Sequence, residues 1–282
     1  TTETKTRNAA GELTVSSITT DTYSLSVTGS PILLSRTTKN GSSASDPASI
    51  DQQIFSYDKY GNLKSSHTET QTKDASGALR VTSTVDEKYT LGPTGQPQLV
   101  ERITRVGDMA NPAEVRTQSF SYDRFGNLRT SHTDIQTRNA TGALVVTGVV
   151  DEGYSLSVTG SAILLSRVSQ SGVPTQPAVV DEQNFAYDRY GNLVSSHTES
   201  KARDAAGSVR VTSVTDEVFT VGPTGQAQLV RRVTKTGNAA DPTETRTQTF
   251  SYDRFGNLTA SRIESQTRNA AGALVVSGIV DE

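Results

Sequence analysis

The sequence predicts an all-β protein: a long antiparallel β-hairpin meander of tandem 65-residue repeats, coiled into a spiral, tube or solenoid-like fibre. First, the heptapeptide Tyr-Asp-x-aromatic-Gly-Asn-Leu occurs four times at a constant spacing of 65 residues, at 57–63, 122–128, 187–193 and 252–258. A fixed period is typical of stacked supersecondary units. Second, 33 Ser and 40 Thr accompany a hydrophobic content of only 33%, which favours half-exposed strands over a thick core. Third, turn sequences that end in glycine recur between segments in which the side-chain pattern repeats every two residues, as in a β-strand.

The repeats divide the chain without leaving room for separate globular domains. We expect one continuous array of a partial repeat, three full repeats and a second partial repeat, at 1–56, 57–121, 122–186, 187–251 and 252–282. Neighbouring repeats alternate in detail, so the finer period is 130 residues. Since both ends cut a unit, we expect the chain to be a stretch of a longer protein.

Each repeat contains four predicted strands, which its turns separate. In the repeat that starts at Tyr122, the turns are Asp123–Gly126, Asn139–Gly142, Ser157–Gly160 and a longer connection with Pro174. Asp, Asn or Ser at the first position and Gly at the fourth indicate a type I turn closed by a left-handed glycine. Between the turns lie β-branched segments of about 10–14 residues, which predict about seventeen strands in all. No segment has a helical period, so we expect essentially no helix.

The turns also predict the strand register and hence the neighbours of each side chain. If Asp123 lies opposite Asn127, then an apolar row runs across successive strands through Tyr122, Leu128, Tyr154, Leu164 and Tyr187. The predicted turn and row residues are Tyr57, Asp58, Gly61, Tyr122, Asp123, Gly126, Leu128, Tyr154, Leu164, Tyr187, Asp188, Gly191, Tyr252, Asp253 and Gly256.

Polar pairs follow from the same register. Cross-strand ion pairs are predicted for Asp86 with Arg102, Asp151 with Arg167 and Asp216 with Arg232. Cross-strand contacts between Gln and His are predicted for Gln53 with His67, Gln118 with His132 and Gln183 with His197.

The region around each Tyr-Asp pair resembles the YD-repeat, or Rhs-repeat, proteins. The matching segments are Phe55–Leu63, Phe120–Leu128, Phe185–Leu193 and Phe250–Leu258. The resemblance implies a large bacterial secreted or cell-surface protein whose hairpins form one long β-sheet, often coiled into a hollow shell. It also implies that the repeats are architecture and that any enzyme lies outside them.

Candidate chemical sites each have a simpler structural interpretation. The three histidines are four strands apart, about 19 Å, so one metal ion cannot bind two of them. The motif aspartates, which could be calcium ligands, are explained as turn formers. Adjacent carboxylates such as Asp86 and Glu87 point to opposite faces of a strand, which argues against a glycosidase pair. We therefore predict no catalytic residue, no metal site and no cofactor.

Function and partners follow from the same observations. We expect a non-enzymatic structural region of a bacterial extracellular filament, sheath or giant adhesin. The alternatives are an Rhs-type shell around a toxin and a carbohydrate- or ice-binding module, which the Thr-x-Thr runs at 68–72 and 243–249 suggest. Expected partners are further repeats, identical subunits or a surface glycan. The net charge of -3 argues against nucleic acid, and no apolar run is long enough to span a membrane.

Overall fold

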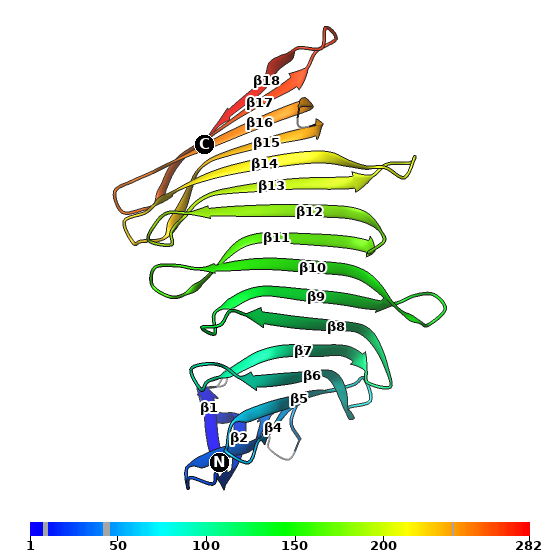
Figure 1. Ribbon diagram of the computed structural model, residues 1–282, viewed down its shortest axis with the longest axis vertical. Helices are drawn as coiled ribbons and strands as arrows, with labels where there is room; N and C mark the ends of the chain where they lie inside the picture. Colours follow the sequence, from blue (N-terminus) through cyan, green and yellow to red (C-terminus); the bar gives the residue numbers. More distant parts are fainter. Residues whose placement is uncertain (8–10, 42–45, 239) are drawn as a thin grey trace. The chain divides into compact units, whose positions relative to one another are not determined.

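All regular structure that the computed structural model describes is β-strand (Figure 1). The structure describes residues 1–7, 11–41, 46–238 and 240–282, and it contains no helix in these ranges. The eighteen strands, one more than expected, are β1 (Thr2–Arg7), β2 (Leu13–Leu25), β3 (Pro31–Asn40), β4 (Ser49–Tyr57), β5 (Leu63–Lys73), β6 (Leu79–Leu91), β7 (Pro97–Asp108), β8 (Asn111–Tyr122), β9 (Leu128–Arg138), β10 (Leu144–Leu156), β11 (Ala162–Val173), β12 (Gln176–Tyr187), β13 (Leu193–Arg203), β14 (Val209–Val221), β15 (Ala227–Asn238), β16 (Asp241–Tyr252), β17 (Leu258–Arg268) and β18 (Leu274–Asp281).

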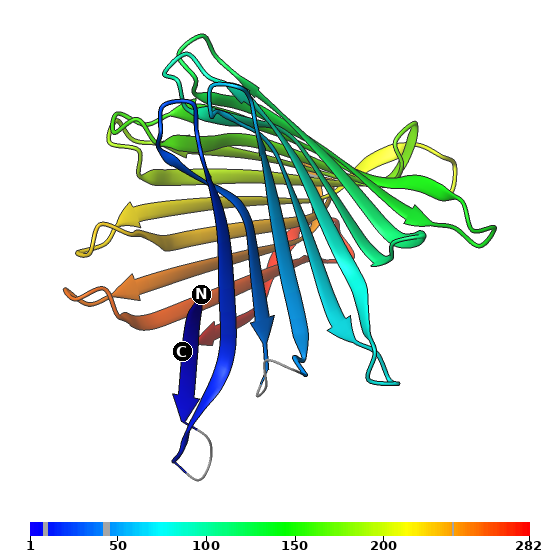
Figure 2. The ribbon, with the colours of Figure 1, turned by 90° about the horizontal axis from the view of Figure 1, so that it is seen from below.

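The chain divides into two compact units. Unit 1 comprises Thr1–Gly126 with Thr133–Val145, and unit 2 comprises Asn127–His132 with Val146–Glu282. In unit 1, each strand from β1 to β7 pairs antiparallel with the next strand in the chain. Unit 2 has the same order from β10 to β18. Each unit is therefore a meander, and both views draw its strands side by side in chain order (Figures 1 and 2).

The hairpin turns have the predicted geometry. At the motif turn of unit 2, the Asp188 N–H donates to the Asn192 carbonyl at 2.9 Å, and the Gly191 N–H donates to the Asp188 carbonyl at 3.1 Å. Gly191 has a φ of 89°, in the left-handed region that only glycine adopts at little cost. The opposite turn at Asp204 repeats this pattern, with Gly207 at a φ of 82°.

Most hairpins contain a β-bulge, and this changes the register beyond the turn. Tyr187 lies opposite Leu193, as the turn predicts, but Ala186 lies opposite Ser195, so Leu193 and Ser195 flank one extra residue. Between β10 and β11, Tyr154 lies opposite Leu164 while Gly153 lies opposite Ser166. A bulge adds one residue to one strand only. Every pair beyond it is therefore displaced by one position.

The displacement corrects the predicted polar pairs. Arg102, Arg167 and Arg232 lie opposite Glu87, Glu152 and Glu217, not opposite Asp86, Asp151 and Asp216. His67 and His197 lie opposite Ile54 and Asn184 on one side, not opposite Gln53 and Gln183. On the other side these two histidines lie opposite Asp86 and Asp216. The predicted pairs at these positions were wrong because the turns alone carry no information about the bulges, and the pair of Gln118 with His132 stays a prediction.

Neither unit has a thick core. Each unit is a single layer of strands, and the buried apolar side chains among the described residues are those of Val115, Val149, Val180 and Val214. No large side chain in the described part of the chain is fully buried. The hydrogen-bond ladder, the turns and cross-strand side-chain rows therefore provide most of the order in each unit.

No helix long and apolar enough to cross a membrane occurs among the residues that the structure describes.

Candidate functional site

The motif turn is the turn within the heptapeptide Tyr-Asp-x-aromatic-Gly-Asn-Leu. Hydrogen bonds hold it together, and most of the repeated residues of the heptapeptide take part in a contact. The Asp188 carboxylate accepts the Tyr190 N–H at 2.8 Å, the Asn192 N–H at 2.9 Å and the Asn192 side-chain amide at 2.9 Å. These bonds favour the ionised carboxylate and hold the pKa of Asp188 below its ordinary value, with the Asn192 side chain as the largest cause. Asp58 and Asp253 make the same contacts and have lowered pKa values for the same reason.

The motif tyrosine joins neighbouring hairpins. The Tyr187 hydroxyl donates to the Leu164 carbonyl of β11 at 2.9 Å, next to the bulge in that strand. Tyr57, Tyr122 and Tyr252 donate in the same way to Leu33, Leu99 and Leu229, at 2.7–2.8 Å. Burial raises the pKa of Tyr57, Tyr122 and Tyr187. Because a bulge disrupts the backbone ladder locally, a hydroxyl from the next strand supplies a donor there.

A buried serine and a glutamate form a polar seam beside this tyrosine row. The Ser196 hydroxyl donates to Glu217 at 2.8 Å, and the Arg232 guanidinium lies 2.7 Å from the same carboxylate. In unit 1, Ser66, Tyr89 and Arg102 contact Glu87 at 2.6–2.8 Å. Burial alone would raise the pKa of Glu87, but the bonds from Tyr89, Ser66 and Arg102 together lower it. The serines are 2–7% exposed, at Ser66, Ser131, Ser196 and Ser261.

The histidines form a second row, of His–Asp pairs. The Nδ1 atoms of His67 and His197 lie 2.7 Å from Asp86 and Asp216, and that of His132 lies 2.6 Å from Asp151. Surface hollows of about 380, 350 and 380 Å³ open beside these three pairs. In the next repeat Arg262 replaces the histidine and contacts Asp281 at 3.2 Å. The replacement of His by Arg indicates that the position serves as the donor to an aspartate.

One part of the heptapeptide has no packing role. The aromatic residue at the third turn position is 58–64% exposed in all four copies, at Tyr60, Phe125, Tyr190 and Phe255. The preceding Lys59, Arg124, Arg189 or Arg254 places its cation 4.5–4.8 Å from the ring centre. Cation–π contacts of exposed groups contribute only about 0.5–1 kcal/mol. A contribution to stability of this size does not explain why all four copies of the motif have an exposed aromatic ring.

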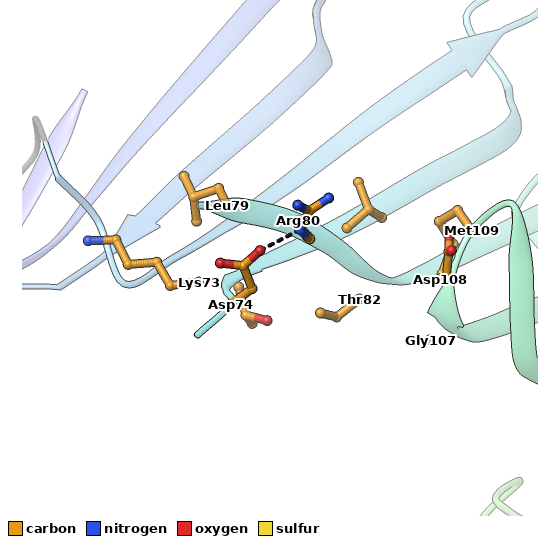
Figure 3. A pocket seen from close by; sticks show the side chains of 10 residues that line it. Lys73, Asp74, Leu79, Arg80, Thr82, Gly107, Asp108 and Met109 are labelled. Carbon is orange, nitrogen blue, oxygen red and sulfur yellow. Dashed lines mark hydrogen bonds and ion pairs between the residues drawn. The ribbon is translucent and has the colours of Figure 1, made fainter. Parts of the chain in front are cut away.

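A hollow of about 690 Å³ lies in unit 1 beside the turn at Asp74, at the end of the strands away from the motif turns (Figure 3). Its charged lining includes Lys73, Asp74, Arg80 and Asp108, with Met109 at one end. Asp74 pairs with Arg80, and its carboxylate also accepts the Ser76 hydroxyl at 2.5 Å and the Ser76 N–H at 2.8 Å. These bonds lower the pKa of Asp74, so this carboxylate is a poor proton acceptor near neutral pH.

Sequence reasoning missed the serine–glutamate seam and the His–Asp row. The signal was present, because Ser-His at 66–67, 131–132 and 196–197 is followed by Asp-Glu at 86–87, 151–152 and 216–217. The available signal was their complementary chemistry, a pair of donors on one strand and a pair of carboxylates on the next. Because adjacent residues point to opposite faces, such dipeptides can make two contacts, one on each face of the sheet. Among the described residues there is no group of three or more His, Cys, Asp or Glu side chains that could hold a metal ion.

No protein-family model matches the chain, and no curated protein sequence matches it significantly. Among solved structures, a porin-like protein from Bacteroides uniformis is 9% identical with a TM-score of 0.32, over 83% of this chain and 91% of that one. A TcdB2–TccC3 structure is 14% identical with a TM-score of 0.23, over 98% of this chain and 16% of that one. A Ca²⁺-stabilised, ice-binding adhesin of an Antarctic bacterium is 12% identical with a TM-score of 0.12, over 88% of this chain and 92% of that one. At these TM-scores the likenesses assign no function to the chain.

Proposed function

We propose that this chain is a non-enzymatic structural repeat region of a bacterial extracellular filament, sheath or giant adhesin. In this proposal it is a repeat array of the YD or Rhs type, and its meander coils into a spiral, tube or solenoid-like fibre. Further repeats or identical subunits are its partners. The observation that carries the proposal is the recurrence of one set of contacts at 65-residue spacing, from Tyr57 with Leu33 to Tyr252 with Leu229.

The distribution of polar groups supports an architectural role. The motif carboxylates are saturated by turn hydrogen bonds, and the seam glutamates are held by serine and arginine side chains. The carboxylates of each turn and each seam make the same contacts in every repeat of the array. Their contribution to stability then grows with the number of repeats, as expected for a structural material.

Insertion of one complete pair of repeats tests this proposal. A second copy of residues 122–251 placed after residue 251 adds 130 residues and keeps the alternation of repeat types. Eight added strands should add about 38 Å along the curved sheet, at about 4.8 Å per strand, so the particle should become longer by up to this amount while its diameter stays the same. Small-angle scattering and electron microscopy measure this length. An inserted chain that stays the same length and becomes thicker would contradict a fibre.

A second candidate function is binding of a surface glycan at the motif turns. The specific observation is the exposed aromatic ring beside a cation at Tyr60, Phe125, Tyr190 and Phe255. A glycan array probed with the intact chain tests it, with a variant that replaces all four rings by alanine (Tyr60→Ala, Phe125→Ala, Tyr190→Ala, Phe255→Ala) as the comparison. Signals that this variant retains in full would exclude the turn tips as the binding surface.

A further inference from the structure

The hairpin turns at one end of the strands carry large apolar side chains in both units. Every second turn of a meander lies at the same end, and in unit 2 the turns at 157–160, 188–191, 222–225 and 253–256 lie together at the left of Figure 1. Their two central positions hold Val-Thr, Arg-Tyr, Pro-Thr and Arg-Phe in this order. Unit 1 has the same series of tip residues, and we call the row of tips in each unit the apolar rim; in unit 1 it consists of Val27, Tyr60, Pro93 and Phe125.

The side chains of the apolar rim are exposed. Val27 and Val158 are 74% and 72% exposed, which is more than the four aromatic rings, and Pro93 and Pro223 are exposed as well. Hairpin tips in water are usually formed by Gly, Asn, Asp or Ser. Contiguous exposed apolar surface is typical of a contact with a protein or a membrane. The residues before the turns that lack a ring enlarge this surface, with exposures of 38–70% for Leu25, Leu91, Leu156 and Val221.

The turns at the other end of the strands show that the hairpin itself does not require apolar tips. Both ends use the same turn geometry, with the closing glycine at a φ of 89° in Gly191 and 82° in Gly207. The two central positions of the four-residue turns at the other end nevertheless hold small residues. They are Ala-Ser at 75–76, Ala-Thr at 140–141 and Ala-Ala at 205–206 and 270–271.

The charge that the apolar rim presents to solvent is positive. Each ring has an exposed cation beside it, from Lys59, Arg124, Arg189 or Arg254. The turns between the ring-bearing turns contain no charged residue. The motif carboxylates accept N–H groups of their own turns, so they are directed toward the backbone, as at Asp58, Asp188 and Asp253. Apolar tips with cations beside them complement a surface that is both apolar and anionic.

We propose that the apolar rim is a docking surface for an anionic phospholipid bilayer. The rings, valines and prolines would lie at the boundary of head groups and acyl chains, and the adjacent Lys and Arg side chains would contact lipid phosphates. Successive tips are two strands or about 10 Å apart, so the four tips of a unit extend over about 30 Å. A glycan would select the rings, which can stack on sugars, whereas exposed valine and proline offer only apolar area. This role goes beyond the proposed structural function and does not depend on it.

Co-sedimentation of the intact chain with vesicles tests the proposal. We expect binding to vesicles of phosphatidylcholine with phosphatidylserine, and weaker binding to phosphatidylcholine alone. The variant that replaces the four rings by alanine should bind the mixed vesicles about tenfold more weakly, because binding scales with the apolar area that enters the interface. A matched control is a Leu13→Ser, Val173→Ser, Val209→Ser chain, which removes side chains of 42–61% exposure at the other end of the strands. The control should bind like the wild-type chain, and circular dichroism checks that both variants fold.

The depth of the tips has its own measurement, because the chain contains no tryptophan. A Val158→Trp chain places one fluorophore in the apolar rim, and an Ala205→Trp chain places one at the other end of the strands. The emission of the first should shift to shorter wavelength with the mixed vesicles, and that of the second should not. Absence of vesicle binding, full binding by the four-ring variant, or equal shifts at the two positions would overturn the proposal.

A last variant separates lipid from glycan. Val27→Ser, Val158→Ser should weaken vesicle binding and leave any glycan-array signal unchanged, since valine does not stack on sugars. A glycan signal from a chain that binds no vesicles would overturn lipid docking in favour of a glycan.

Discussion

Replacement of Tyr187 by phenylalanine tests whether the motif tyrosine stabilises the meander through its hydroxyl group. The hydroxyl donates to the Leu164 carbonyl at 2.9 Å, and burial raises the pKa of this tyrosine. The Tyr187→Phe change keeps the ring opposite Leu193 and removes only the donor. A neutral hydrogen bond contributes about 1 kcal/mol to the free energy of unfolding, so we expect a loss of this size.

Repetition makes the effect larger and easier to measure. Tyr57 and Tyr252 make the same bond in their own repeats, at 2.8 Å each. Sites this far apart with no shared partners act additively. The triple variant Tyr57→Phe, Tyr187→Phe, Tyr252→Phe should therefore lose about 3 kcal/mol, three times the single value of about 1 kcal/mol.

Urea unfolding followed by circular dichroism measures the loss as a lower midpoint with an unchanged slope. Tyr190→Phe is the matched control, because Tyr190 belongs to the same turn and is 58% exposed. This control should leave the midpoint within experimental error. Equal stability of Tyr187→Phe and the wild-type chain, or equal losses in Tyr187→Phe and Tyr190→Phe, would refute the proposed role of the hydroxyl.

Three further predictions concern the turns and the register. Gly191→Ala should lower the urea midpoint more than Gly207→Ala. Both glycines have a φ above 80°, so the backbone strain is similar. A Cβ at position 191 would lie 2.8 Å from the Ser157 Cβ, whereas a Cβ at position 207 would meet nothing within 4 Å. The pKa values of Asp58, Asp188 and Asp253 are lowered in the folded state. Their contribution to stability should therefore be complete above about pH 4 and lost as the pH falls through their folded-state pKa values. Urea midpoints measured from about pH 5 downward check this, and Asn192→Ala should reduce the pH dependence. A Glu217→Cys, Arg232→Cys chain should form a disulfide on oxidation and an Asp216→Cys, Arg232→Cys chain should not, since adjacent residues point to opposite faces; mass spectrometry under non-reducing conditions distinguishes the two.

Turn chemistry was predictable from sequence, and the strand register beyond the turns was not. Asp188 and Gly191 occupy the turn positions that their residue types predict, because a left-handed residue and a side-chain acceptor are local requirements. The bulge between Tyr187 and Ala186 depends on how two strands twist around each other. The extra residues at such bulges differ in chemistry, as Lys64, Val194 and Thr259 show. The residue type at the extra position therefore does not predict the bulge.

The candidate site was predictable in its residues but not in its partners. Tyr154 lies opposite Leu164, as the turn at Ser157 predicts, because no bulge separates that pair from the turn. Arg167 lies beyond the bulge and meets Glu152 instead of Asp151. Since Asp and Glu alternate between the two faces of a strand, a shift of one residue exchanged the partners without leaving a charge unpaired. Where two carboxylates are adjacent, an arginine has an acidic partner in either register, so charge pairing alone cannot distinguish the two registers.

The same alternation explains how a single layer of strands keeps both faces ordered. On one face Ser196, Glu217 and Arg232 form the seam beside the tyrosine row. On the other face His197 contacts Asp216. Exposed ion pairs contribute little individually. A shift of β15 by one residue would place Asp216 opposite Arg232 and Glu217 opposite Arg231, so these charges do not select the register by themselves, and the turns do. A chain with Asp216→Asn should consequently unfold at nearly the wild-type urea concentration, and so should a chain in which Glu217 and Arg232 are exchanged, whereas Arg232→Glu alone should lower the urea midpoint because two carboxylates then face each other.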